Sequence, residues 1–140
     1  MIPLIIRLIS PFFLLFFITA CNLVFVTDKA VVEKAIALQI NLSQEQITQQ
    51  FRQNSTPPPL KINRVVITDV ESLKLQNLPT FRVMGTYDFT LEYPRKEIRH
   101  KQNPYQVYLQ QQKEGKTWRL LRPQKKPGDN ETQWFSYLIE

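Results

Sequence analysis

The stretch that decides the fold is Phe81-Arg82-Val83-Met84-Gly85-Thr86-Tyr87-Asp88-Phe89-Thr90-Leu91-Glu92-Tyr93. Apolar and polar side chains alternate along it. Because successive side chains of a strand point to opposite faces, this pattern predicts one long antiparallel strand with a buried and a solvent-exposed face. The exposed face should include Asp88 and Thr90. Its thirteen residues at about 3.3 Å each span roughly 43 Å, about twice a typical strand, so the sheet should curve, with its bend at Gly85.

A helix is predicted between Asp28, a suitable N-cap, and the helix-breaking triproline 57–59. Its apolar stripe has helical spacing and consists of Val32, Ile36, Ile40, Ser43, Ile47 and Phe51. Ser43 also opens a capping-box pattern, so the helix could break at residues 41–43. The stripe keeps its phase across that point, which favours one helix.

The remaining segments predict further strands. Residues 61–75 form a strand candidate with a bulge near 69–72, because its apolar parity changes there. Residues 95–103 are predicted as a polar, basic connection. Alternation resumes at Tyr105, and residues 113–116 predict a hairpin turn with Gly115 at a positive φ. A strand from Trp118, a loop over 123–132 and a last strand over 134–139 complete the chain.

This order predicts an α+β fold, in which one N-terminal helix packs on a curved antiparallel sheet of four to five strands. Residues 28–140 should form a single domain. In element order and strand length, this part resembles the cystatin-like and NTF2-like group, where a curved sheet wraps one helix. The stretch from Leu60 to Leu121 also resembles an uncharacterised family of small proteins from photosynthetic bacteria, and that resemblance implies no activity.

The first 26 residues predict a membrane-directed segment. Arg7 is followed by nineteen uncharged residues, from Leu8 to Val26. One interpretation is a cleaved signal peptide over residues 1–20, followed by a tether over 21–27. The other is an uncleaved transmembrane anchor over residues 8–26. The positive charge of Arg7 places the domain outside the cytoplasm under either interpretation.

The sequence Ile18-Thr19-Ala20-Cys21 resembles a bacterial lipobox, and Cys21 is the only cysteine of the chain. This resemblance implies that Cys21 is the mature N-terminus and the site of lipid attachment, carrying acyl chains such as palmitate. The domain would then be lipid-anchored at the cell membrane, on its periplasmic or extracytoplasmic side.

The whole excess of positive charge lies in one third of the chain. The net charge is +6, and between Pro94 and Lys126 ten basic residues face two acidic ones. Such a bias indicates anionic partners. Candidate contacts to an anionic surface are Arg95, Lys96, Arg99 and Lys101, with anionic lipid or a membrane protein as partner. A solvated basic face is the simpler alternative, and nucleic acid is not expected outside the cytoplasm.

Residues for catalysis or metal binding are scarce. One histidine, one cysteine and three glycines exclude a phosphate loop and a cysteine-based metal site, so neither a cofactor nor enzyme activity is expected. The carboxylate pairs Asp69 with Glu71 and Asp88 with Glu92 fit solvated strand faces better than acid–base couples. The sequence predicts an accessory, partner-binding lipoprotein of a membrane assembly. The alternative is a small-ligand carrier with a pocket lined by Tyr87, Phe89 and Trp118.

Overall fold

The computed structural model describes residues 28–51 and 56–140. The predicted signal, anchor and tether, with Cys21, lie outside these residues. Helix α1 (Lys29–Phe51) has 23 residues and is therefore roughly 35 Å long. Asp28 caps it as predicted: its carboxylate accepts a hydrogen bond from the Ala30 N–H at 3.0 Å. The helix does not break at Ser43, whose hydroxyl donates to the Gln39 carbonyl oxygen one turn earlier at 2.8 Å.

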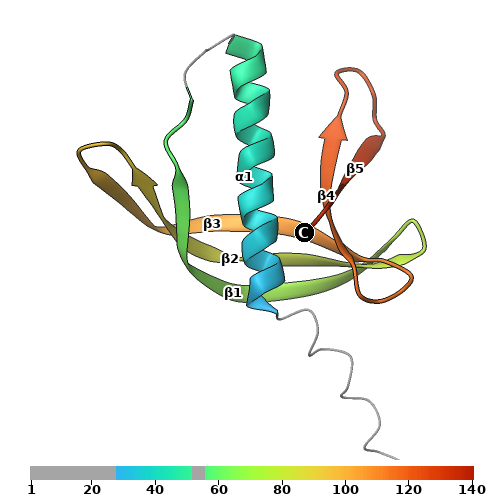
Figure 1. Ribbon diagram of the computed structural model, residues 1–140. Helices are drawn as coiled ribbons and strands as arrows, with labels where there is room; N and C mark the ends of the chain where they lie inside the picture. Colours follow the sequence, from blue (N-terminus) through green and yellow to red (C-terminus); the bar gives the residue numbers. More distant parts are fainter. Residues whose placement is uncertain (1–27, 52–55) are drawn as a thin grey trace, which may run out of the picture.

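Within the described residues, five antiparallel strands follow in a single sheet, and their order in the sheet is their order in the chain. They are β1 (Leu60–Leu75), β2 (Leu78–Glu92), β3 (Glu97–Gln111), β4 (Trp118–Lys125) and β5 (Thr132–Leu138). The long strands β1, β2 and β3 curve beneath α1, while the β4–β5 hairpin rises beside the helix (Figure 1). The predicted α+β class is confirmed, with one helix packed on a curved antiparallel sheet.

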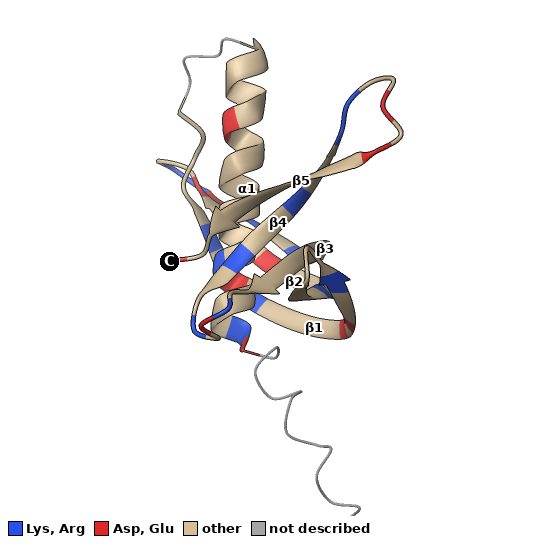
Figure 2. Cartoon of the chain, turned by 90° about the vertical axis from the view of Figure 1, so that its right-hand side faces the viewer, with Lys and Arg blue, Asp and Glu red and all other residues tan. Residues whose placement is uncertain are grey.

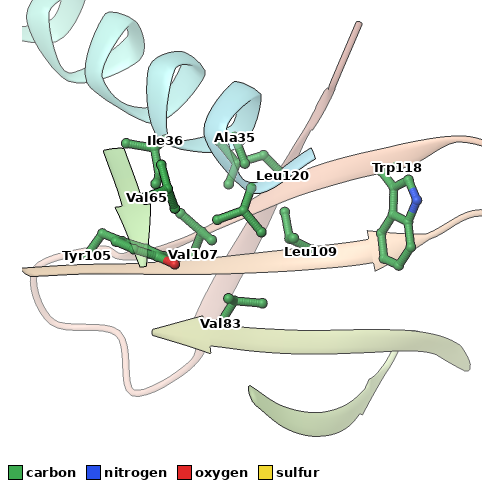
Figure 3. Packing of buried hydrophobic residues seen from close by; sticks show 10 residues of the cluster. Ala35, Ile36, Val65, Val83, Tyr105, Val107, Leu109, Trp118 and Leu120 are labelled. Carbon is green, nitrogen blue, oxygen red and sulfur yellow. The ribbon is translucent and has the colours of Figure 1, made fainter. Parts of the chain in front are cut away.

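The core lies between the first half of α1 and the concave face of the sheet (Figure 3). From the helix come Val32, Ala35 and Ile36, and from the sheet come Val65, Val83, Tyr105, Val107, Leu109, Trp118 and Leu120. The apolar stripe of the helix thus packs on the apolar face of the sheet. This contact removes the apolar side of both elements from water.

Register shifts adapt the long strands to this curvature. In the pairing of β1 with β2 they fall between Ile62 and Arg64 and between Ile67 and Asp69. The second shift lies at Thr68, one residue before the predicted bulge. Between β2 and β3 a shift falls at Asp88, whose carboxylate accepts a hydrogen bond from the Gln102 N–H at 2.7 Å. Bulges of this kind increase local twist and bend a strand.

Two predicted connections are wrong. Residues 95–103 are not a loop, because a tight turn over 93–96 is closed by a 2.9 Å hydrogen bond from the Tyr93 N–H to the Lys96 carbonyl oxygen, and β3 begins at Glu97. Likewise, β4 continues through Pro123 to Lys125. In both places the polar composition reflects exposure of the strand, while backbone pairing with the neighbouring strand decides the structure. The predicted turn at Gly115 is confirmed, with φ at 74°.

The exposed face predicted for β2 is wrong at Thr90. This residue is only 5% exposed, and its hydroxyl accepts a hydrogen bond from the side-chain amide of Asn63 at 2.7 Å. Asn63 lies at the first register shift of β1, so the shift brings a polar side chain over the face that alternation assigns to solvent.

Candidate partner-binding surfaces

The three residues predicted to line a pocket do not converge. The rings of Tyr87 and Phe89 stack with centroids 5.6 Å apart, and burial raises the pKa of Tyr87. Trp118 packs instead on Phe81, with centroids 6.0 Å apart. Along β3, the residues paired with Tyr87 and Trp118 are Asn103 and Gln111, which are roughly 26 Å apart. Side chains of α1 fill the concavity between these two aromatic groups.

The four predicted anionic contacts do come together. Arg95, Lys96, Arg99 and Lys101 are all exposed on the turn and first residues of the β2–β3 hairpin, and we call them the basic hairpin. Glu97 lies 4.0 Å from Arg99, but both side chains are largely exposed, at 59% and 71%. An exposed ion pair of this kind contributes at most about 1 kcal/mol, so Glu97 does not keep Arg99 from an anionic partner.

The basic hairpin lies far from the start of α1. In Figure 1 the β2–β3 tip rises at the left of the molecule, whereas α1, which begins at Lys29, starts in blue at its lower end. His100 is part of this hairpin, and its ring stacks on Phe89 with centroids 4.8 Å apart. The histidine therefore packs against an aromatic side chain in a mostly basic strand end.

A second surface, which the sequence did not predict, lies between α1 and the β4–β5 hairpin. A hollow of about 170 Å³ there is lined by Gln46, Arg122, Pro123, Gln124, Phe135 and Tyr137, and we call it the arm groove. Arg122 reaches across it and donates a hydrogen bond to the Ser43 hydroxyl at 3.4 Å. A hydrogen bond thus links the helix and the hairpin at this point, and both continue beyond it.

Large apolar side chains remain exposed around the arm groove. Ile47, Phe51 and Phe135 are 53%, 67% and 43% exposed. Ile47 and Phe51 lie one and two helical turns after Ser43, so they extend the face of α1 that meets Arg122. The signal for this surface was present in the sequence as the last two members of the helical stripe. The periodicity of the stripe does not show where the sheet beneath the helix ends, so the exposure of these two residues could not be predicted from it.

Two of the four carboxylates considered for catalysis have structural partners. Glu71 forms an ion pair with Arg82, and Asp88 accepts the Gln102 N–H. Over residues 28–51 and 56–140 there is no cluster of three side chains suited to hold a metal ion. Among these same residues, no helix is long and apolar enough to cross a membrane.

No protein-family model matches the chain, and no curated protein and no solved structure is significantly similar to it. The proposals that follow therefore rest on the geometry of this chain.

Proposed function

We propose that this protein is an exported lipoprotein, anchored through Cys21, that acts as an accessory, partner-binding protein of a membrane assembly. The observation that carries the proposal is the arm groove, where Ile47, Phe51 and Phe135 stay exposed although the core between the first half of α1 and the sheet is filled. Exposed apolar side chains that cluster on a small domain mark interaction sites. A fold related to the cystatin-like and NTF2-like group is the finer form of the proposal, supported by the long curved strands beneath one helix.

The position of the basic hairpin adds to this proposal. It lies away from Lys29, the described helical residue nearest to Cys21 in the chain. An acidic surface of a membrane protein is therefore a better partner for it than the lipid headgroups next to the anchor. The small-ligand carrier is less well supported, because Val32, Ala35 and Ile36 occupy the space that a ligand would need.

The proposal is tested by purifying the full-length protein from detergent-solubilised membranes. Ile47→Asp combined with Phe51→Asp places two charges in the arm groove and should reduce the bound protein at least tenfold. The matched control is Gln49→Asp with Gln50→Asp, which changes two exposed residues of the same helix by the same charge and should leave binding unchanged. Equal recovery of bound protein with both variants contradicts the proposal.

A further inference from the structure

The last strand of the sheet has an unpaired edge. Within the described residues, β5 pairs with β4 alone. The Ile139 N–H donates to the Trp118 carbonyl oxygen at 3.1 Å. In this register Phe135 lies opposite Arg122. Because hydrogen-bonded and non-bonded pairs alternate in an antiparallel ladder, Phe135 and Tyr137 bond to β4. The N–H and carbonyl groups of Trp134, Ser136 and Leu138 then point outward.

This edge lacks the protection that edge strands usually carry. β5 contains neither a charged residue nor a proline over its seven residues. β1 forms the opposite edge of the sheet and carries Lys61, Arg64, Asp69, Glu71 and Lys74. Charged side chains on an edge strand oppose pairing with another chain. One edge of the sheet is thus guarded, and the other is open to a further strand (Figure 2).

We infer that β5 pairs antiparallel with β5 of a second copy of this chain, about a two-fold axis at Phe135. The inference rests on the proposed function, since it names the protein that the arm groove binds. In this register Trp134 lies opposite the partner's Ser136, so the outward-pointing backbone groups of both strands are satisfied. Phe135 meets the partner's Phe135 at a non-hydrogen-bonded pair, where side chains across an antiparallel ladder are closest.

The charge distribution suits this contact. Two molecules that each carry +6 repel one another, so they can associate only where the local charge is balanced. From residue 123 to 138, Lys125 and Lys126 are matched by Asp129 and Glu131, which leaves no net charge. In this arrangement β5 meets its own copy, and a strand without charged residues allows this without repulsion. Two basic hairpins would repel instead.

The upper half of α1 completes the interface. Figure 2 shows β5 crossing in front of α1, with the last turns of the helix beyond its unpaired edge. A strand added at this edge lies over those turns and covers Ile47 and Phe51. A stable interface buries roughly 1,200–2,000 Å², more than a short strand pair supplies, so these side chains add the remaining area. Both copies use the same edge, and the assembly closes as a dimer.

The test is the mass of the full-length protein in detergent, measured by light scattering with the detergent contribution subtracted. The unaltered protein should contain two chains. Of the backbone hydrogen-bonding groups, Ser136→Pro removes only an outward N–H, which β4 does not use, so this variant should give one chain. Ser136→Ala is the matched control: it removes the hydroxyl that accepts from Arg119 at 3.0 Å but keeps the N–H, and should remain a dimer.

A single chain in the unaltered protein, or a dimer that persists in Ser136→Pro, overturns the inference. If the unaltered protein is monomeric, and the Ile47→Asp, Phe51→Asp variant loses a bound protein other than a second copy, the proposed function stands without the dimer. Should Ser136→Pro fail to fold, oxidation of Phe135→Cys decides, since paired residues at this position lie within disulfide range. Thr132→Cys should not cross-link, because its two copies would lie roughly 20 Å apart. Equal cross-linking of both variants also overturns the inference.

Discussion

The hydroxyl group of Tyr105 donates a hydrogen bond to the carbonyl oxygen of Val66 at 3.2 Å. Tyr105 lies on β3 and Val66 on β1, so the bond passes over β2, which separates these two strands. The residue of β2 opposite Tyr105 is Gly85, whose missing side chain leaves the space for the tyrosine to cross. A Cβ at position 85 would overlap the Val66 carbonyl oxygen and lie 3.0 Å from the tyrosine oxygen.

Gly85→Ala should therefore destabilise the domain. The added methyl group meets backbone, which cannot move without shifting β1, and overpacking of this kind costs about 1–3 kcal/mol or more. The urea midpoint measures the loss. Ser72→Ala, at an exposed position of β1, is the control. Its free energy of unfolding, obtained from the same urea curves, should change by less than about 0.5 kcal/mol. A midpoint for Gly85→Ala equal to that control would contradict the close approach.

The same contact should make stability fall at alkaline pH. Burial raises the pKa of Tyr105 from 10.0 to about 12. Between these values the unfolded chain loses the phenolic proton while the folded protein keeps it, so stability is full below pH 10 and declines as the pH rises toward 12. Denaturation midpoints measured from pH 8 to 12 should fall less steeply for Tyr105→Phe than for the unaltered protein. Parallel curves would show that Tyr105 does not hold its proton in the fold.

The basic hairpin should bind anionic surfaces in a salt-dependent way. A chain beginning at Thr27 is expected to bind anionic vesicles at low salt and to detach as salt rises. Reversing Arg95, Lys96, Arg99 and Lys101 together should abolish binding. Reversing only Arg95 and Lys96 should cost at least about 2 kcal/mol, or roughly thirtyfold in affinity.

The control for this experiment reverses Lys113 and Lys116, which are exposed in the turn between β3 and β4. It changes the net charge equally and should retain most of the binding. If both double reversals weaken binding alike, only the total charge matters. If neutral and anionic vesicles bind equally, the basic hairpin is a solvated face.

Cys21 provides the test of membrane attachment. Cys21→Ser should block processing and leave a chain that still carries the twenty residues before it. Thr19→Ser keeps a small residue in the lipobox and should be processed normally. Intact-mass analysis of protein extracted from membranes distinguishes the forms. If the protein with the native sequence begins at Met1 and carries no acyl chain, the uncleaved anchor is favoured. Stable attachment by lipid alone needs two or more acyl chains, so such a protein must be held in the membrane by its N-terminal segment.

The features predicted correctly from the sequence depend on local physics. The Asp28 cap, the uninterrupted helix and the Gly115 turn each follow from a few neighbouring residues. The start of β3 was missed because a run of basic residues resembles a loop until a partner strand supplies its backbone hydrogen bonds. The burial of Thr90 depends on a register shift in β1, and register is a property of two strands.

The candidate sites show the same division. The basic hairpin was found from charge alone, since its four members are close in the chain. The pocket lined by Tyr87, Phe89 and Trp118 was expected in the concavity between a curved sheet and the helix, but strand pairing separates the tryptophan from the other two. The arm groove depends on where α1 outruns the sheet. The spacing of Ile47 and Phe51 in the stripe is the same as that of the buried Val32 and Ile36.

The simple order of the strands has a consequence for how the chain acquires its structure. Each strand can pair with its predecessor as it is synthesised, which keeps most contacts local and favours rapid folding. The helix, however, comes first, and one of its buried partners, Leu120, belongs to β4 near the end. Until β4 is present, Ala35 and Ile36 lack part of their covering. A nascent or truncated chain that stops before Trp118 should therefore need a chaperone to shield the helix, although three of its five strands are already complete.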